Sequence, residues 1–273
     1  MSTLWLVATP IGNLGDLSSR AVEVLASVGL VCCEDTRRTG KLLQHAGIRV
    51  ERLAVCNEHT EFDRVGDVLA VLASGRDVAV VSDAGTPGIS DPGERLVAAA
   101  IDAGHAVSAV PGPAAATMAV TISGFPSDRY VYEGFLPRKG RHRTERLADV
   151  AAERRTVVLY EAPHRIERTL ADLLEVCGAE RGVAVSRELT KLHEETVRAT
   201  LGTLDLADPR GEYVIVLAPV VEVDVAADDE AVRALLRAEL DGAASTRDAA
   251  TSVAERTGRR RREVYQLAVD LGR

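Results

Sequence analysis

The sequence predicts two α/β domains followed by a small helical extension, and three observations support this. Short apolar strands alternate with helical patterns through residues 1–120, which is the rhythm of a mostly parallel sheet covered by helices on both faces. In residues 121–222 the later strands follow one another over short connections, as in hairpins. Residues 223–273 begin with an acidic stretch and continue as helical segments.

In the first domain, β-branched runs predict the strands and amphipathic runs predict the helices. The expected strands are Leu4–Ala8, Leu30–Glu34, Leu53–Val55, a run from Val78, and Ala106–Val110. The expected helices are Ser18–Ser27, Thr36–Ala46, Glu58–Ala73, Glu94–Ala103 and an alanine-rich helix from Ala114.

Gly124-Phe125-Pro126 interrupts this pattern, which places the domain boundary near residue 120. The strands expected in the second domain are Arg129–Gly134, Thr156–Tyr160, Gly182–Arg187, Thr196–Leu201 and Tyr213–Leu217. Its expected helices are Arg143–Ala152 and Arg165–Val176.

The C-terminal region is predicted to be a linker followed by two helices. Glu222–Glu230 is acidic and is expected to be the linker, and Ser245-x-x-Asp248 is a capping box that opens a helix. Gly258 ends that helix, and an arginine-rich helix follows as far as Leu271. This pattern indicates either a helix-turn-helix that contacts nucleic acid or a helical hairpin that packs on the second domain.

Composition excludes several protein classes. The 273 residues are 46% apolar and 27% charged, with a net charge of −8, which is typical of a folded globular protein. No apolar run reaches the roughly 18–20 residues of a membrane span, and the N-terminus has no basic region like that of a signal peptide. The four cysteines contain no C-x-x-C pair, so we expect reduced thiols and a cytoplasmic protein.

The most informative segment is the loop Ser82–Gly93, which follows the strand at Val78. It is rich in Gly, Pro and Ser, and it carries Asp83 and Asp91 but no Lys or Arg. Ligands of parallel sheets bind at the carboxyl ends of the strands, and an acidic loop favours a neutral or cationic ligand over a phosphate. An ordinary connection between a strand and a helix is the alternative interpretation.

Similar polar segments follow most of the other predicted strands, so we expect them to line one cleft. They are Thr9–Asp16, Glu34–Arg38, Asn57–His59, Pro111–Ala115, Tyr160–Arg165 and Ser186–Lys191. The sequence contains no G-x-G-x-x-G, P-loop, H-E-x-x-H or G-x-S-x-G motif and no zinc-ligand spacing. Hydride transfer, nucleotide hydrolysis and metal catalysis are therefore not expected.

Seven motifs together resemble the tetrapyrrole-methylase superfamily and, within it, the ribosomal RNA small-subunit methyltransferase I group. They are Ala8–Asp16, Glu34–Arg37, Ser82–Gly93, Val110–Ala114, Gly134–Pro137, Tyr160–Arg165 and Arg187–Lys191. The resemblance covers residues 1–220, and the C-terminal region resembles the helical extension of that group. It implies a cleft between two α/β domains that holds S-adenosylmethionine, within a homodimer.

The resemblance also implies which residues bind the cofactor. They are Asp83, Ala84, Gly85, Ile89, Ser90, Pro111, Ala114, Ala115 and Tyr160. The loop Ser82–Gly93 is longer than the Gly-Asp-Pro loop of the porphyrin methylases, so the contacts beyond Gly85 do not transfer directly. The two aspartates suit the sulfonium and ammonium charges of S-adenosylmethionine.

The reaction implied is methylation of the ribose 2′-oxygen of a cytidine in the decoding centre of 16S rRNA. Residues suited to accept the hydroxyl proton are Glu58, His59, Glu188 and Lys191, and Lys191 needs a lowered pKa for that role. Residues suited to contact RNA are Arg37, Arg138, Lys139, Arg141, Arg165, Arg187, Arg259 and Arg260. A salt bridge between domains is the alternative role of Arg37, Arg165 and Arg187.

Two other functions remain open at this level. A methylase of a small molecule such as a tetrapyrrole would use the same cleft, although only 3% of the residues are aromatic and available to stack on a macrocycle. A non-catalytic protein that binds RNA during ribosome assembly would keep the fold without binding the cofactor.

Overall fold

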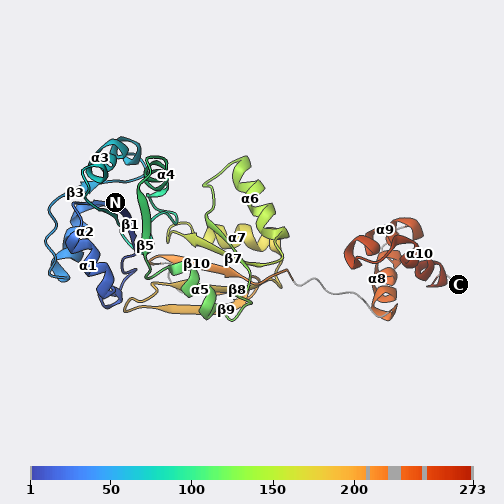
Figure 1. Ribbon diagram of the computed structural model, residues 1–273. Coiled ribbons are helices and arrows are strands. Elements are labelled where there is room, and N and C mark those ends of the chain that lie inside the picture. Colours follow the sequence, from blue (N-terminus) through green and yellow to red (C-terminus); the bar gives the residue numbers. More distant parts are fainter. Residues whose placement is uncertain (1, 207–209, 221–228, 242–244, 272–273) are drawn as a thin grey trace. The chain divides into compact units, whose positions relative to one another are not determined.

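The computed structural model describes residues 2–206, 210–220, 229–241 and 245–271. The chain divides into two compact units, Met1–Pro219 and Val220–Arg273. The first unit contains two five-stranded sheets, and the second unit is helical (Figure 1). Among the described residues no helix is long and apolar enough to span a membrane.

The first sheet is parallel throughout, as the alternating pattern predicts. Its order is β3 (Leu53–Val55), β2 (Leu30–Cys33), β4 (Val78–Val80), β1 (Thr3–Val7) and β5 (Ala106–Val110). Its helices are α1 (Ser19–Ser27), α2 (Thr36–His45), α3 (Glu61–Ala73) and α4 (Glu94–Asp102). Leu25 of α1 and Leu43 of α2 pack on one face, and Leu72 of α3 and Leu96 of α4 pack on the other. Both faces of the sheet are therefore buried, which explains its continuous apolar strands.

The second sheet is mixed. Its order is β6 (Tyr130–Phe135), β7 (Thr156–Glu161), β10 (Tyr213–Leu217), β8 (Gly182–Arg187) and β9 (Glu195–Thr200). Only β6 and β7 pair in parallel, and the remaining pairs are antiparallel. Helices α6 (Arg141–Ala152) and α7 (Ile166–Cys177) bury Leu147 and Leu173 against one face.

Helix α5 (Ala115–Ser123) joins the two sheets, because it follows β5 of the first sheet and packs on the second. Its residues Ala119 and Val120 are buried against Val158 and Val216, and Ile11 from the loop after β1 belongs to the same cluster. Residue 120, where the sequence predicts a domain boundary, lies inside this helix. Helix α5 therefore packs with the second sheet, and Ile11 brings the loop after β1 into the same apolar core.

The C-terminal unit is a cluster of three helices, α8 (Asp229–Asp241), α9 (Thr246–Thr257) and α10 (Arg261–Leu271). Leu236, Val253 and Val264 form its core. The predicted cap of α9 is confirmed, since the Ser245 hydroxyl accepts a hydrogen bond from the Asp248 amide. Gly258 ends α9 in a left-handed conformation with φ of 62°.

Two sequence-based boundaries need correction. Most of the predicted linker Glu222–Glu230 lies outside the described residues, and its last two residues open α8, a helix that the sequence analysis did not predict. Helix α3 begins at Glu61 and not at Glu58, because the Asn57 side chain accepts hydrogen bonds from the amides of His59 and Thr60 and forms a turn there.

The loop Ser82–Gly93 is held at its far end by a buried carboxylate. Glu61 is 6% exposed, and its Oε1 accepts hydrogen bonds from the amides of Gly93 (2.9 Å) and Arg95 (3.0 Å). These amides open α4, whose N-cap residue Gly93 has no side chain to cap them. Glu61 therefore caps a helix that lies more than thirty residues later in the chain.

We expect Glu61→Ala to lower the free energy of unfolding by about 2–3 kcal/mol, because the buried Gly93 amide and the partly buried Arg95 amide lose a charged acceptor. This corresponds to a fall in Tm of roughly 5–10 °C for a unit of this size, measurable by calorimetry. Glu61→Gln keeps an acceptor oxygen and should lose less than half as much. Glu23→Ala, at an exposed position of α1, serves as the control. Equal stability of the Ala variant and the wild type would show that Glu61 does not act as this cap.

Candidate active site

The loops after β1 and β4 are joined by a backbone bridge at the carboxyl end of the first sheet. The Thr9 amide donates to the Gly85 carbonyl (2.8 Å), and the Gly85 amide donates to the Thr9 carbonyl (3.1 Å). Gly85 has φ of 90°, and a Cβ at this position would lie 3.3 Å from Ile11 Cγ2. Only glycine adopts this conformation without strain at such close range.

A second close approach joins the loop after β1 to the loop after β8. A Cβ on Gly12 would lie 2.4 Å from Lys191 Cγ, and the Asn13 amide donates to the Thr190 hydroxyl (3.1 Å). Glu188 and Thr190 themselves have positive φ values of 49° and 67°. Strained backbone of this kind is concentrated at functional sites, where the surrounding structure holds it in place.

These loops surround a cavity of about 420 Å³. This volume is within the range of small-molecule sites, roughly 300–1,000 Å³. The lining residues come from loops of both sheets, and they include Ile11, Glu34, Arg38, Asp83–Thr86, Ile89–Asp91, Ala114, Ala115, Phe135, Tyr160–His164, Glu188, Leu189, Lys191 and Glu212–Val214.

Most of the residues expected to bind the cofactor line this one cavity. They are Asp83, Ala84, Gly85, Ile89, Ser90, Ala114, Ala115 and Tyr160. Pro111, which precedes this group on the loop after β5, is not among the lining residues. Eight of the nine residues expected to bind the cofactor therefore lie together, as the convergence of the strand ends predicts.

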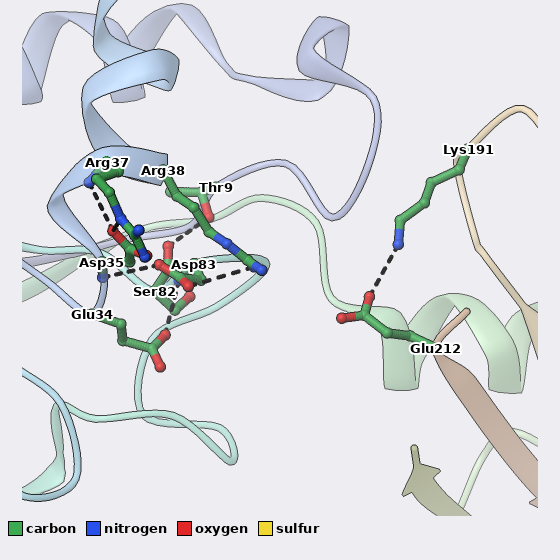
Figure 2. A network of polar contacts seen from close by, with 9 residues as sticks. All are labelled: Thr9, Glu34, Asp35, Arg37, Arg38, Ser82, Asp83, Lys191 and Glu212. Carbon is green, nitrogen blue, oxygen red and sulfur yellow. Dashed lines mark hydrogen bonds and ion pairs between the residues drawn. The ribbon is translucent and has the colours of Figure 1, made fainter. Parts of the chain in front are cut away.

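Carboxylates dominate the charge on the side of the cavity formed by the first sheet. Glu34 Oε1 accepts a hydrogen bond from the Asp83 amide (2.8 Å), and Asp83 Oδ1 accepts one from the Asp35 amide (3.1 Å) (Figure 2). Among the described residues neither Glu34 nor Asp91 has an ion-pair partner. Burial, together with the negative charges of Glu34 and Asp83, raises the pKa of Asp91 to about 7. Burial also raises the pKa values of Glu34 and Asp83.

The candidate bases Glu188 and Lys191 both line the cavity and bind one another. Lys191 Nζ lies 2.9 Å from Glu188 Oε1 and 3.1 Å from Glu212 Oε2. Burial lowers the pKa of Lys191, but its hydrogen bonds to the two carboxylates outweigh burial, and the net shift is upward. The ammonium form is therefore stabilised, which is opposite to the shift that a lysine base requires.

The other candidate bases and several arginines lie elsewhere. Glu58 and His59 are in the turn before α3 and do not line the cavity. The Arg37 side chain binds Asp35 at 2.7 Å, Arg187 binds Glu195 at 2.9 Å, and Arg165 binds Glu161 at 3.1 Å. Arg165 also donates to the Leu136 carbonyl and is 18% exposed, so it holds the end of β6 in place.

The cationic residues of the loop after β6 are exposed. Arg138 and Lys139 have no ion-pair partner among the described residues, whereas Arg141 pairs with Glu145 at 2.6 Å. In the C-terminal unit Arg259 binds Asp229 at 2.7 Å, and Arg260 is exposed immediately before α10.

An aromatic cluster that was not expected from the sequence lies at the cavity. The rings of Tyr132 and Tyr160 lie 5.2 Å apart, and those of Phe135 and Tyr160 lie 5.6 Å apart, both edge to face. Tyr160 accepts a hydrogen bond from the Ala116 amide, and Tyr132 hydrogen-bonds to Ser90 at 2.5 Å. These contacts tie the loop after β4 to the second sheet. Tyr132 and Phe135 stand out in the sequence of β6 as aromatic residues, but nothing in that sequence places them beside Tyr160.

Comparisons with known proteins agree with this geometry. A family profile described as Tetrapyrrole (Corrin/Porphyrin) Methylases matches residues 3–205. The chain belongs to the tetrapyrrole methylase family. A second profile, described as the RsmI C-terminal HTH domain, matches residues 226–272.

Relatives in this family resemble the chain over nearly its whole length. A protein of Synechocystis sp. named Ribosomal RNA small subunit methyltransferase I is 45% identical and covers 99% of both chains. A protein of the same name from Escherichia coli O157:H7 is 42% identical over 98% of this chain and 94% of that one.

Among solved structures, the methyltransferase CobJ covers 81% of this chain and 95% of its own, with a TM-score of 0.62 and 20% identity. Uroporphyrin-III-C-methyltransferase from Thermus thermophilus gives a TM-score of 0.54 at 20% identity, covering 79% of this chain and 94% of its own. The fold is thus that of the tetrapyrrole methylases. Among the described residues, no group of acidic, His or Cys side chains is suited to hold a metal.

The raised pKa of Asp91 predicts a pH dependence of stability. The folded-state pKa of about 7 lies above the unfolded value of 3.8, so the stability associated with this group is complete below pH 4 and is lost as the pH rises through 7. Asp91→Asn removes this loss. We therefore expect its Tm relative to that of the wild type to be higher at pH 8 than at pH 5, as measured by scanning calorimetry. The same Tm difference at both values would contradict the raised pKa, and Asp102→Asn, at an exposed position, is the control.

Proposed function

We propose that this protein methylates the ribose 2′-oxygen of a cytidine in the decoding centre of the small-subunit ribosomal RNA, with S-adenosylmethionine as methyl donor. The observation that carries the proposal is the 45% identity, over 99% of both chains, to a protein named Ribosomal RNA small subunit methyltransferase I. The cavity supports it, because most of the positions that the resemblance assigns to the cofactor line it. The predicted homodimer and cytoplasmic location stay predictions.

The chemistry of the cavity suits S-adenosylmethionine. This molecule carries a sulfonium and an ammonium charge, and Glu34 and Asp91 offer carboxylates that are not paired with cations of the described residues. Small residues at Ala84, Gly85 and Ala114 leave backbone groups accessible to a ligand. The edge of Tyr160 and the exposed Phe135 provide an apolar surface for the adenine ring.

When bound, S-adenosylmethionine supplies an electrophilic methyl group on a sulfur that leaves as a neutral thioether. The residues of this chain position the two reacting partners and exclude water, and orientation of this kind is worth roughly 7–11 kcal/mol of the barrier. Lys191 lines the cavity, and its ion pairs with Glu188 and Glu212 hold its side chain in place there.

The test is transfer of radiolabelled methyl to small ribosomal subunits that lack this modification, followed by nuclease mapping of the labelled nucleotide. We expect label on a 2′-oxygen of a cytidine in the decoding centre. Label on a base would contradict the proposal. Absence of label together with calorimetric binding of S-adenosylmethionine would favour a small-molecule methylase, and absence of both would favour a non-catalytic RNA-binding protein.

We expect the loop after β6 to contribute to RNA affinity. Replacing both Arg138 and Lys139 with Ala should weaken binding and reduce the slope of log K against log salt by roughly 0.7–0.9 per residue, because each cation releases counterions from one phosphate. Filter binding of ribosomal RNA between 50 and 200 mM salt, about the range over which such slopes are measured, gives this slope. Arg49→Ala, another exposed arginine with no partner among the described residues, is the matched control. An unchanged slope in the double variant would exclude this loop from the interface.

A further inference from the structure

A second, smaller hollow adjoins the cavity on the side of α2. Its volume is about 270 Å³, and it is lined by Thr9, Pro10, Leu14, Arg38, Thr39, Lys41, Leu42, Ser82 and Asp83. Two residues, Arg38 and Asp83, line both spaces. Their side chains point toward one another and form an ion pair of 3.5 Å (Figure 2). This pair therefore lies at the boundary between the two spaces.

The chemistry of the second hollow differs from that of the cavity. It contains the cations Arg38 and Lys41 and the hydroxyl residues Thr9, Thr39 and Ser82, and Asp83 is its only carboxylate. Lys41 is exposed and has no ion-pair partner among the described residues. The two cations suit the phosphates of a nucleotide, whereas the acidic cavity suits a cationic ligand.

The ion pair between Arg38 and Asp83 is longer and has fewer contacts than the neighbouring pair between Arg37 and Asp35. Arg37 binds Asp35 through two short hydrogen bonds, from Nε at 3.1 Å and from Nη2 at 2.7 Å. Among the described residues Arg38 has one ion pair, at 3.5 Å, and 67% of its side chain is exposed. An exposed pair of this kind contributes little, so a phosphate that offers a bidentate contact can replace Asp83 as the partner of Arg38.

Asp83 is held in a fixed orientation. Its Oδ1 accepts from the Asp35 amide at 3.1 Å, and its own amide donates to Glu34 at 2.8 Å. The remaining oxygen, Oδ2, faces Arg38. Burial raises the pKa of Asp83 and the charge of Arg38 lowers it, so departure of Arg38 makes the carboxylate a stronger proton acceptor.

We propose that the second hollow receives the target nucleotide, that Arg38 turns from Asp83 to a phosphate of the RNA, and that Asp83 accepts the proton of the ribose 2′-hydroxyl. This inference rests on the proposed function. The 2′-hydroxyl loses its proton to Asp83 Oδ2, and the electron pair of the oxygen forms the bond to the methyl carbon. The carbon–sulfur bond breaks, and its electron pair leaves with sulfur. Binding of RNA thereby draws Arg38 away from Asp83 and leaves this carboxylate free to act as the base.

The first test is Asp83→Asn, which keeps the acceptor for the Asp35 amide but removes the charge. At saturating S-adenosylmethionine we expect kcat to fall by about 10²–10⁴-fold, the usual contribution of a general base. RNA affinity should stay the same or rise, because Arg38 loses a competing carboxylate. A fall in RNA affinity or a kcat within threefold of the wild type would overturn the proposal.

The pH profile of kcat separates Asp83 from its neighbours. Glu34, Asp35, Arg38 and Asp91 all face Asp83, and Glu34 and Asp91 also have raised pKa values. Asp91 does not line the second hollow. We therefore expect the fall of kcat at acid pH to disappear in Asp83→Asn and to remain in Asp91→Asn. Loss of this fall in Asp91→Asn alone would assign the base to Asp91 and overturn the proposal.

The second test is Arg38→Ala, with Lys41→Ala as its partner variant. Both should weaken RNA binding and reduce the salt slope by roughly 0.7–0.9 each. Lys41 does not line the cavity, so Lys41→Ala should leave the calorimetric affinity for S-adenosylmethionine within about threefold of the wild type. Arg49→Ala and Asp102→Asn are the matched controls. Unchanged RNA affinity in both Arg38→Ala and Lys41→Ala would overturn the second hollow as the nucleotide site. Absence of 2′-O-methylation by the wild type would instead overturn the proposed function. The affinities for RNA and for the cofactor would still be measured separately, so the two failures can be told apart.

Discussion

The backbone bridge between Thr9 and Gly85 is the constraint on which the site depends. It joins the loops that follow β1 and β4, and these loops contribute Ile11 on one side and Asp83 to Asp91 on the other. Because Gly85 adopts a left-handed conformation against Ile11, the two loops can approach closely enough to form a single wall. Gly12 extends this wall to the loop after β8, so the second sheet is brought to the same place. One local pairing thus determines the position of charged groups from three distant segments.

The architecture of the sheets was predictable from local patterns, because a run of consecutive apolar residues indicates a buried strand. The strands Leu53–Val55 and Ala106–Val110 have the bounds that the sequence predicts. The carboxyl ends of these strands converge by geometry alone, which is why most of the expected cofactor positions line one cavity. Helix α8 was missed because it opens with Asp229 and Glu230, two acidic residues that continue the composition of the preceding segment.

Contacts between distant residues were not predictable from local patterns. Glu61 caps a helix that begins more than thirty residues later, and nothing in its own segment indicates this role. The aromatic cluster combines Tyr132 with Tyr160, which are adjacent only because β6 and β7 pair in parallel. The partner of Arg187 depends in the same way on strand pairing, because Glu195 lies on the neighbouring strand β9. Arg165 differs, since its partner Glu161 lies only four residues earlier in the chain.

The composition of the chain has a practical consequence for chemistry at its surface. The chain contains only three lysines, Lys41, Lys139 and Lys191, and its other Lys or Arg positions are all arginines. Each lysine stands in a different part of the first unit, one in the smaller hollow, one in the loop after β6 and one at the rim of the cavity. Acylating reagents that attack primary amines therefore have one target at each of these places, besides the chain's α-amino group. Lys191, bound between two carboxylates, should react most slowly, and mass spectrometry of the three acylated peptides would follow each place separately as ligands bind.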